Sequence, residues 1–127
     1  MENLIIFLIF LWATFFITRI CAVYFHDKIY DKETPRKSKA KTLTGFLRRK
    51  TGFDWHHVHL GMIIIIISFF LFKIKFIVFL IFLAVGMSLF LDQIFPLINI
   101  GNYFSKKMFF ISFLLHLIVS LFITLKF

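Results

Sequence analysis

The chain has 127 residues, of which 61% are hydrophobic and 21 are phenylalanine. Soluble domains are about 45–50% apolar, so this composition excludes an ordinary soluble domain, whose interior could not bury so much phenylalanine. The net charge is +9, and the charged residues lie mostly between apolar runs. This position favours anionic lipid headgroups over nucleic acid as the partner of the basic residues. The lone Cys21 excludes both an intrachain disulfide and a cysteine-rich zinc module.

Four apolar runs predict four transmembrane helices. They cover residues 4–24, 57–72, 76–94 and 108–125. A spanning helix needs about 20 residues, so the second and fourth runs need their flanking residues to complete a span. Backbone groups in lipid must hydrogen-bond internally, so we expect helices even at the isoleucine run 63–67. The expected fold is all-α and integral to a membrane, with residues 1–127 forming a single transmembrane domain.

The connections between these runs carry most of the charge. Most lysines and arginines lie in the long basic loop, residues 25–55, and two more close the connection 96–107 on the same side. By the positive-inside rule both connections are cytoplasmic and both termini lie outside, in a multi-pass cell-membrane protein. Residues 42–50 mix apolar and basic side chains, and two alternatives stay open for them: an interfacial amphipathic segment or a solvated basic loop.

A histidine cluster lies at the start of the second run, where His56, His57 and His59 occur within four positions. Asp92, in the third run, is the only acidic residue inside any of the four apolar runs. His57 and Asp92 are almost equally far along the chain from the tight turn at 73–75. Because every helical residue rises by about 1.5 Å, an antiparallel hairpin brings them to the same height.

Gly61 and Gly86 are also nearly equidistant along the chain from the turn at 73–75, so the hairpin brings them to the same height. Small residues let membrane helices approach closely, so we expect the hairpin to be narrowest at this pair, with the histidines and Asp92 on its cytoplasmic side.

Two or three histidines and a carboxylate suit a divalent metal such as Zn, Fe or Mn. The predicted ligands are His56, His57, His59 and Asp92. A metal held there with an open coordination position could bind water and activate it for attack on a lipid headgroup. The catalytic candidates are Asp92 and Gln93, with Gln93 orienting water or substrate. Supporting roles around the metal fall to Asp54, His116 and Arg19, and headgroup phosphate would be bound by Arg48, Arg49 and Lys50.

Other interpretations stay open. Asp92 could instead belong to a structural polar network, paired with Arg19, and His116 could hydrogen-bond to Ser88 or Ser112. A haem is not expected, because no second histidine lies as deep as His116. The chain could be a non-enzymatic subunit of a larger membrane complex, with other membrane subunits or copies of itself as partners besides lipids, or an ion or proton carrier. No nucleic-acid partner is expected.

The histidine stretch and the Asp92 stretch together resemble small multi-spanning proteins of archaea and bacteria. Their pattern is a histidine cluster followed by a glycine, and then a GxGLxLxxDE-type segment at the end of the next helix. The matching residues are His56, His57, His59 and Gly61, then Gly86, Leu89, Leu91 and Asp92. The resemblance spans residues 45–95 and implies a shared site, but Gln93 replaces the second acid. The layout is also distantly similar to membrane-bound metal-dependent hydrolases.

Overall fold

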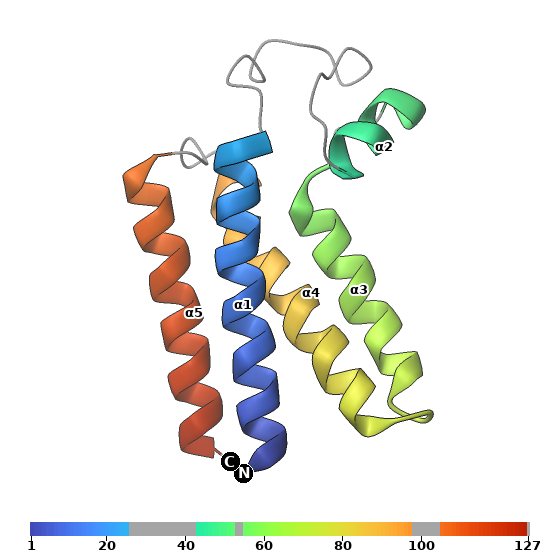
Figure 1. Cartoon of the computed structure of the whole chain (residues 1–127), viewed down its shortest axis with the longest axis vertical. Helices are drawn as coiled ribbons and strands as arrows, with labels where there is room; N and C mark the ends of the chain where they lie inside the picture. Colours follow the sequence, from blue (N-terminus) through green and yellow to red (C-terminus); the bar gives the residue numbers. More distant parts are fainter. Residues whose placement is uncertain (26–42, 53–54, 98–104, 127) are drawn as a thin grey trace.

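The computed structural model describes residues 1–25, 43–52, 55–97 and 105–126 (Figure 1). These residues form five helices and no strand, which confirms the all-α prediction. The helices are α1 (Glu2–Phe25), α2 (Leu43–Thr51), α3 (His57–Leu71), α4 (Phe76–Leu97) and α5 (Lys106–Lys126). Each predicted apolar run forms one helix, and α2 is an additional helix in the basic loop.

Among the described residues, three helices are long and apolar enough to cross a membrane. They contain the candidate spans Glu2–Cys21, Phe76–Phe95 and Lys106–Lys126. The remaining apolar helix, α3, has 15 residues. At about 1.5 Å per residue it is roughly 22 Å long, whereas the hydrocarbon core of a bilayer is about 30 Å thick. Length and hydropathy therefore support a multi-pass membrane protein with three candidate spans.

Helix α4 is the centre of the arrangement. It packs against α3, α1 and α5, and α1 also packs against α5. Figure 1 shows α3 and α4 as a hairpin beside the α1–α5 pair, with both termini close together at one end. Helix α2 lies at the opposite end. The turn between α3 and α4 is tight, since the backbone N–H groups of Ile74 and Lys75 both bond to Leu71 O at 3.0 Å.

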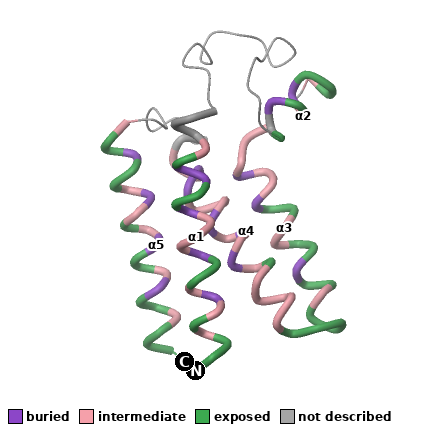
Figure 2. Tube along the Cα trace, in the orientation of Figure 1, coloured by how far each residue is buried: buried purple, intermediate pink, exposed green. Residues whose placement is uncertain are grey.

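The apolar surface of this bundle faces outward. Its small core joins Phe7 and Leu11 of α1 to Ala84 of α4. In Figure 2 the outer faces of α3 and α5 are largely exposed, and the exposed side chains there are mostly isoleucine, leucine and phenylalanine. Only 22–28% of each candidate span is buried inside the protein. Such a surface needs lipid or partner helices to cover it.

The helices of the α3–α4 hairpin approach each other closely at two glycines, as the sequence predicted. A Cβ atom built on Gly61 would lie 2.7 Å from Gly86 O, and one built on Gly86 would lie 2.9 Å from Gly61 O. Both distances are shorter than van der Waals contact. The two helices therefore touch through their backbones here, and this contact fixes which face of α4 meets α3.

The end of α4 differs from the sequence prediction. The helix continues through Pro96 to Leu97, whereas the sequence predicted a helix to residue 94 and a loop from Pro96. Proline has no N–H, so Asp92 O cannot accept the helical hydrogen bond from four residues later. The Ser112 hydroxyl of α5 donates to this carbonyl at 2.9 Å and replaces the missing bond.

Candidate functional site

Helix α4 presents two different polar faces to its neighbours. Successive residues point about 100° apart around a helix, so Asp92 and Gln93 cannot face the same partner. Gln93 faces α3, where its Oε1 accepts a hydrogen bond from the His57 backbone N–H at 3.0 Å. Asp92 faces α1 and α5. The predicted height of the cluster is therefore correct, but the acid and the histidines lie on different sides of α4.

Asp92 is bound by an arginine from α1. Arg19 Nε donates to Asp92 Oδ1 at 2.7 Å. The Ser112 hydroxyl, which bonds to the Asp92 carbonyl, is also 2.9 Å from Oδ1. Asp92 is 1% exposed and Arg19 8%, so the two charges are removed from solvent together. A buried ion pair of this kind is stable only when its members stay together.

Aromatic rings surround the Arg19 guanidinium. Its Cζ lies 5.9 Å from the centre of the Phe15 ring and 5.7 Å from that of Phe109. The negative faces of aromatic rings attract cations, and more strongly where water is excluded. The rings from α1 and α5 therefore stabilise the positive member of the pair, while α4 supplies the negative one.

A row of polar residues runs along α5 below this pair. Ser112, His116, Ser120 and Thr124 are spaced by four residues and share one face of the helix. The first three are buried. Ser112 bonds to Asp92, and Ser120 Oγ accepts a hydrogen bond from Trp12 Nε1 of α1 at 3.0 Å. Of this row, the sequence prediction included only His116 and Ser112, although the regular spacing of all four residues is visible in the sequence.

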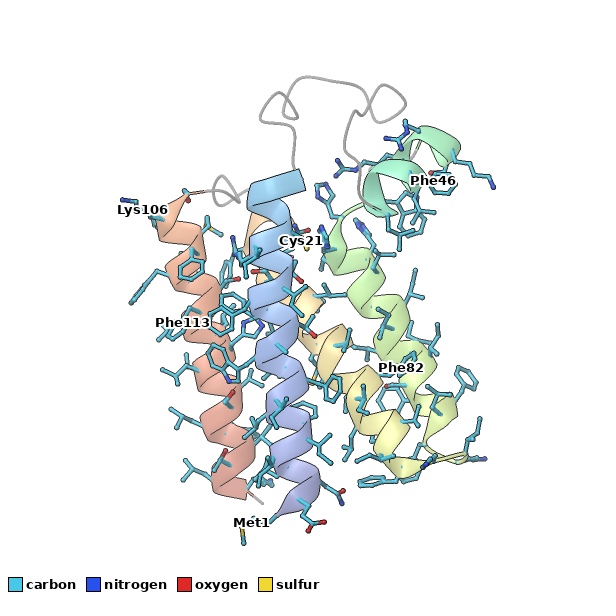
Figure 3. The ribbon with its side chains drawn as sticks, viewed as in Figure 1. Met1, Cys21, Phe46, Phe82, Lys106 and Phe113 are labelled. Atoms are coloured by element: carbon cyan, nitrogen blue, oxygen red, sulfur yellow. The ribbon has the colours of Figure 1, made fainter. Side chains whose placement is uncertain are left out.

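His116 is fully buried in the middle of the row. Its Nδ1 lies 2.8 Å from Ser112 O and its Nε2 lies 3.0 Å from Ser88 Oγ. A carbonyl only accepts hydrogen bonds, so we assign the ring proton to Nδ1, and Ser88 then donates to Nε2. The Phe15 ring packs against the imidazole with centroids 4.6 Å apart. The expected hydrogen bonds of His116 to Ser88 and Ser112 are thus present. Figure 3 shows the side chains that fill the space between α1 and α5, including the labelled Phe113.

The histidine cluster lies at the junction of α2 and α3. The His56 backbone N–H donates to His59 Nδ1 at 3.1 Å, and the two rings have centroids 5.9 Å apart. Arg48 of α2 donates from Nε to Trp55 O at 2.6 Å. Its Nη2 lies 3.3 Å and 3.4 Å from the two ring nitrogens of His56. These contacts join the predicted phosphate-binding arginine to the predicted metal ligands.

The predicted metal site is not assembled in the described part of the chain. Within residues 1–25, 43–52, 55–97 and 105–126, no group of three or more His, Cys, Asp or Glu side chains could hold one metal ion. Asp54 lies outside the described residues. Of the predicted supporting residues, Arg19 binds Asp92 directly and His116 lies one turn along α5 from Ser112. The metal and catalytic roles stay predictions.

Comparison with known proteins adds no family to this description. Protein-family models, curated proteins and solved structures gave no significant match. The resemblance to small multi-spanning archaeal and bacterial proteins therefore stays a prediction.

Proposed function

We propose that the chain is a four-span membrane protein that acts as a non-enzymatic subunit of a larger membrane complex. The observation that carries the proposal is the Arg19–Asp92 ion pair. The buried carboxylate of Asp92 is bound by Arg19 and Ser112, which suits a structural role between three helices. Buried charges in membranes mark either a functional pathway or a paired contact, and the geometry supports the paired contact.

Helix α3 is the fourth span in this proposal. It packs along α4 as an antiparallel hairpin, so it shares the depth of a helix that is itself long enough to span. A short helix is accommodated by local thinning of the bilayer and by flanking side chains. Lys73 and Lys75 in the turn are exposed and can extend to the headgroups at that end. The basic end, with α2, is then cytoplasmic and both termini are outside.

The two competing functions are less well supported. A metal-dependent headgroup enzyme would require Asp92 to leave Arg19 and to turn about 100° around α4 toward the histidines. A proton carrier would need an unbroken relay of groups that both accept and donate protons. His116 Nδ1 instead faces the Ser112 backbone carbonyl, which has no proton to pass on.

The outer faces of the bundle support the subunit interpretation. Helix α3 packs mainly against α4, and its outward side chains include Phe69 and Phe70, which are 62% and 73% exposed. Helix α5 exposes Phe110 and Phe122 to a similar degree. Such faces offer wide apolar contacts to partner helices, whose packing in a bilayer depends on shape complementarity.

Two measurements test the proposal. Native mass spectrometry on protein released from its own membranes should detect the chain in a defined complex with other membrane proteins. Elemental analysis of the purified chain should find no Zn, Fe or Mn at a one-to-one ratio. A lone monomer with one equivalent of metal, lost in both His57→Ala and Asp92→Asn, would overturn the proposal in favour of the enzyme.

A further inference from the structure

Helix α2 buries one charged side chain and exposes two large apolar ones, unlike a helix on the surface of a soluble protein. Arg48 is 4% exposed, whereas Leu43 and Phe46 are 62% and 51% exposed. In a soluble protein the apolar side chains would pack inward and the charge would face water. Here the contacts of Arg48 with Trp55 and His56 hold the arginine face of α2 against the start of α3.

The outward face of α2 combines apolar and basic groups. Leu43, Phe46 and Lys50 lie within about 60° of one another around the helix. Lys50 Nζ lies 6.0 Å from the centre of the Phe46 ring, and Arg49 is exposed on the flank of this face. A long basic side chain beside an exposed ring is the arrangement that places a ring among acyl chains and an ammonium among headgroups.

The position of α2 matches this role. Figure 1 shows α2 at the end of the bundle where α1 ends and α5 begins, and running across the end of α3 rather than continuing it. Gly52, which has a φ of 73°, follows α2 and allows this change of direction. The labelled Phe46 lies on the outer side of α2 in Figure 3.

We propose that α2 lies in the headgroup layer of an anionic leaflet, with Leu43 and Phe46 inserted among the acyl chains and Arg49 and Lys50 bound to lipid phosphates. The proposal rests on the membrane placement of the bundle in the proposed function. It names a lipid-binding surface, composed of Leu43, Phe46, Arg49 and Lys50, that is separate from the polar interior. Basic residues near an anionic surface are attracted to it, so anionic lipid should draw α2 deeper.

Site-directed spin labelling tests the proposal in nanodiscs. In a Cys21→Ser background, the label is attached to the variants Leu43→Cys, Phe46→Cys and Arg49→Cys. A fourth variant, Met62→Cys on the exposed face of α3, reports whether the bundle is in lipid. Oxygen collides with labels in acyl chains, and a nickel chelate collides with labels in water. We expect labels at Leu43 and Phe46 to be at least about threefold less accessible to nickel than the label at Arg49, as for an interfacial helix.

The lipid composition supplies the second comparison. Adding phosphatidylglycerol to phosphatidylcholine nanodiscs should lower nickel accessibility at Phe46, and Arg49→Gln with Lys50→Gln should abolish that change. Equal nickel accessibility at all three α2 positions would overturn the proposal. Labels at positions 43 and 46 that are shielded from both oxygen and nickel would also overturn it, because a protein partner would then cover α2. If the Met62 label also reports water, the membrane placement itself has failed.

Discussion

Arg19 Nε lies 2.7 Å from Asp92 Oδ1, and this ion pair joins α1 to α4 inside an apolar bundle. Removing one member leaves the other charge buried, which typically costs about 3–5 kcal/mol of folding free energy. Asp92→Asn and Arg19→Gln should each lower the free energy of unfolding by an amount in this range, measured by denaturant titration in detergent. Lys106→Gln, which changes an exposed charge on α5, should have little effect. Wild-type stability in Asp92→Asn would contradict the structural role.

Two serines of the interior should differ in their contribution to stability. Ser112 bonds to both the carboxylate and the carbonyl of Asp92, whereas Ser88 bonds to His116, which we assign as neutral. Hydrogen bonds to charged groups contribute about 1.5–3 kcal/mol, and neutral side-chain bonds within membranes average about 0.6 kcal/mol. Ser112→Ala should therefore lower the unfolding free energy more than Ser88→Ala does. The reverse order would show that Ser112 does not stabilise the ion pair.

The glycine contact of the α3–α4 hairpin should tolerate no side chain. A Cβ on Gly61 would lie 2.8 Å from Phe90 N as well as 2.7 Å from Gly86 O, and backbone atoms cannot move aside cheaply. Gly61→Ala and Gly86→Ala should each lower the free energy of unfolding by about 1–3 kcal/mol, the usual penalty for overpacking. Met62→Ala, on the exposed face of α3, is the matched control and should change little. Thermal unfolding that ranks the three variants alike would be inconsistent with backbone contact.

Gly52 should control the orientation of α2. Its φ of 73° is in the left-handed region, and its N–H donates to Arg48 O at 2.8 Å, which ends the helix. Gly52→Ala should lower the free energy of unfolding by about 1–2 kcal/mol. Gly52→Asn should lower it less, because asparagine adopts this backbone conformation more readily. Amide hydrogen exchange should be faster in α2 of the alanine variant and unchanged in α4. Unchanged hydrogen exchange in α2 of the alanine variant would show that Gly52 does not control the orientation of this helix.

The sequence analysis predicted the heights of residues in the hairpin but not their directions around α4, although the glycine pair contained that information. Rise per residue and a tight turn determine height, and they predicted that His57 is level with Asp92 and Gly61 with Gly86. In the structure His57 contacts Gln93, the residue next to Asp92, and the two glycines touch. Direction depends on which face of α4 meets α3. The glycine pair determines that face, and counting forward from Gly86 by helical turns leads to Gln93 rather than Asp92.

The partners of Asp92 were predictable only in part. Arg19 was a candidate because both residues lie near the basic ends of their helices, and the structure joins them. On α5, the bonds of His116 were predicted, whereas the contacts of Ser112 with Asp92 and of Ser120 with Trp12 were not, because they depend on how α5 lies beside α4 and α1. For residues 42–50 the sequence left an interfacial amphipathic segment and a solvated basic loop open, since the choice depends on contacts of Arg48 with residues that follow in the chain.

A double-mutant cycle on Arg19 and Asp92 tests the central claim most directly. Unfolding free energies are compared for the wild type, Arg19→Met, Asp92→Leu and the double variant. If the two side chains are partners, the double variant should be more stable than the sum of the single losses predicts, with a coupling of about 1–3 kcal/mol. Additive losses would contradict the pairing of Arg19 with Asp92.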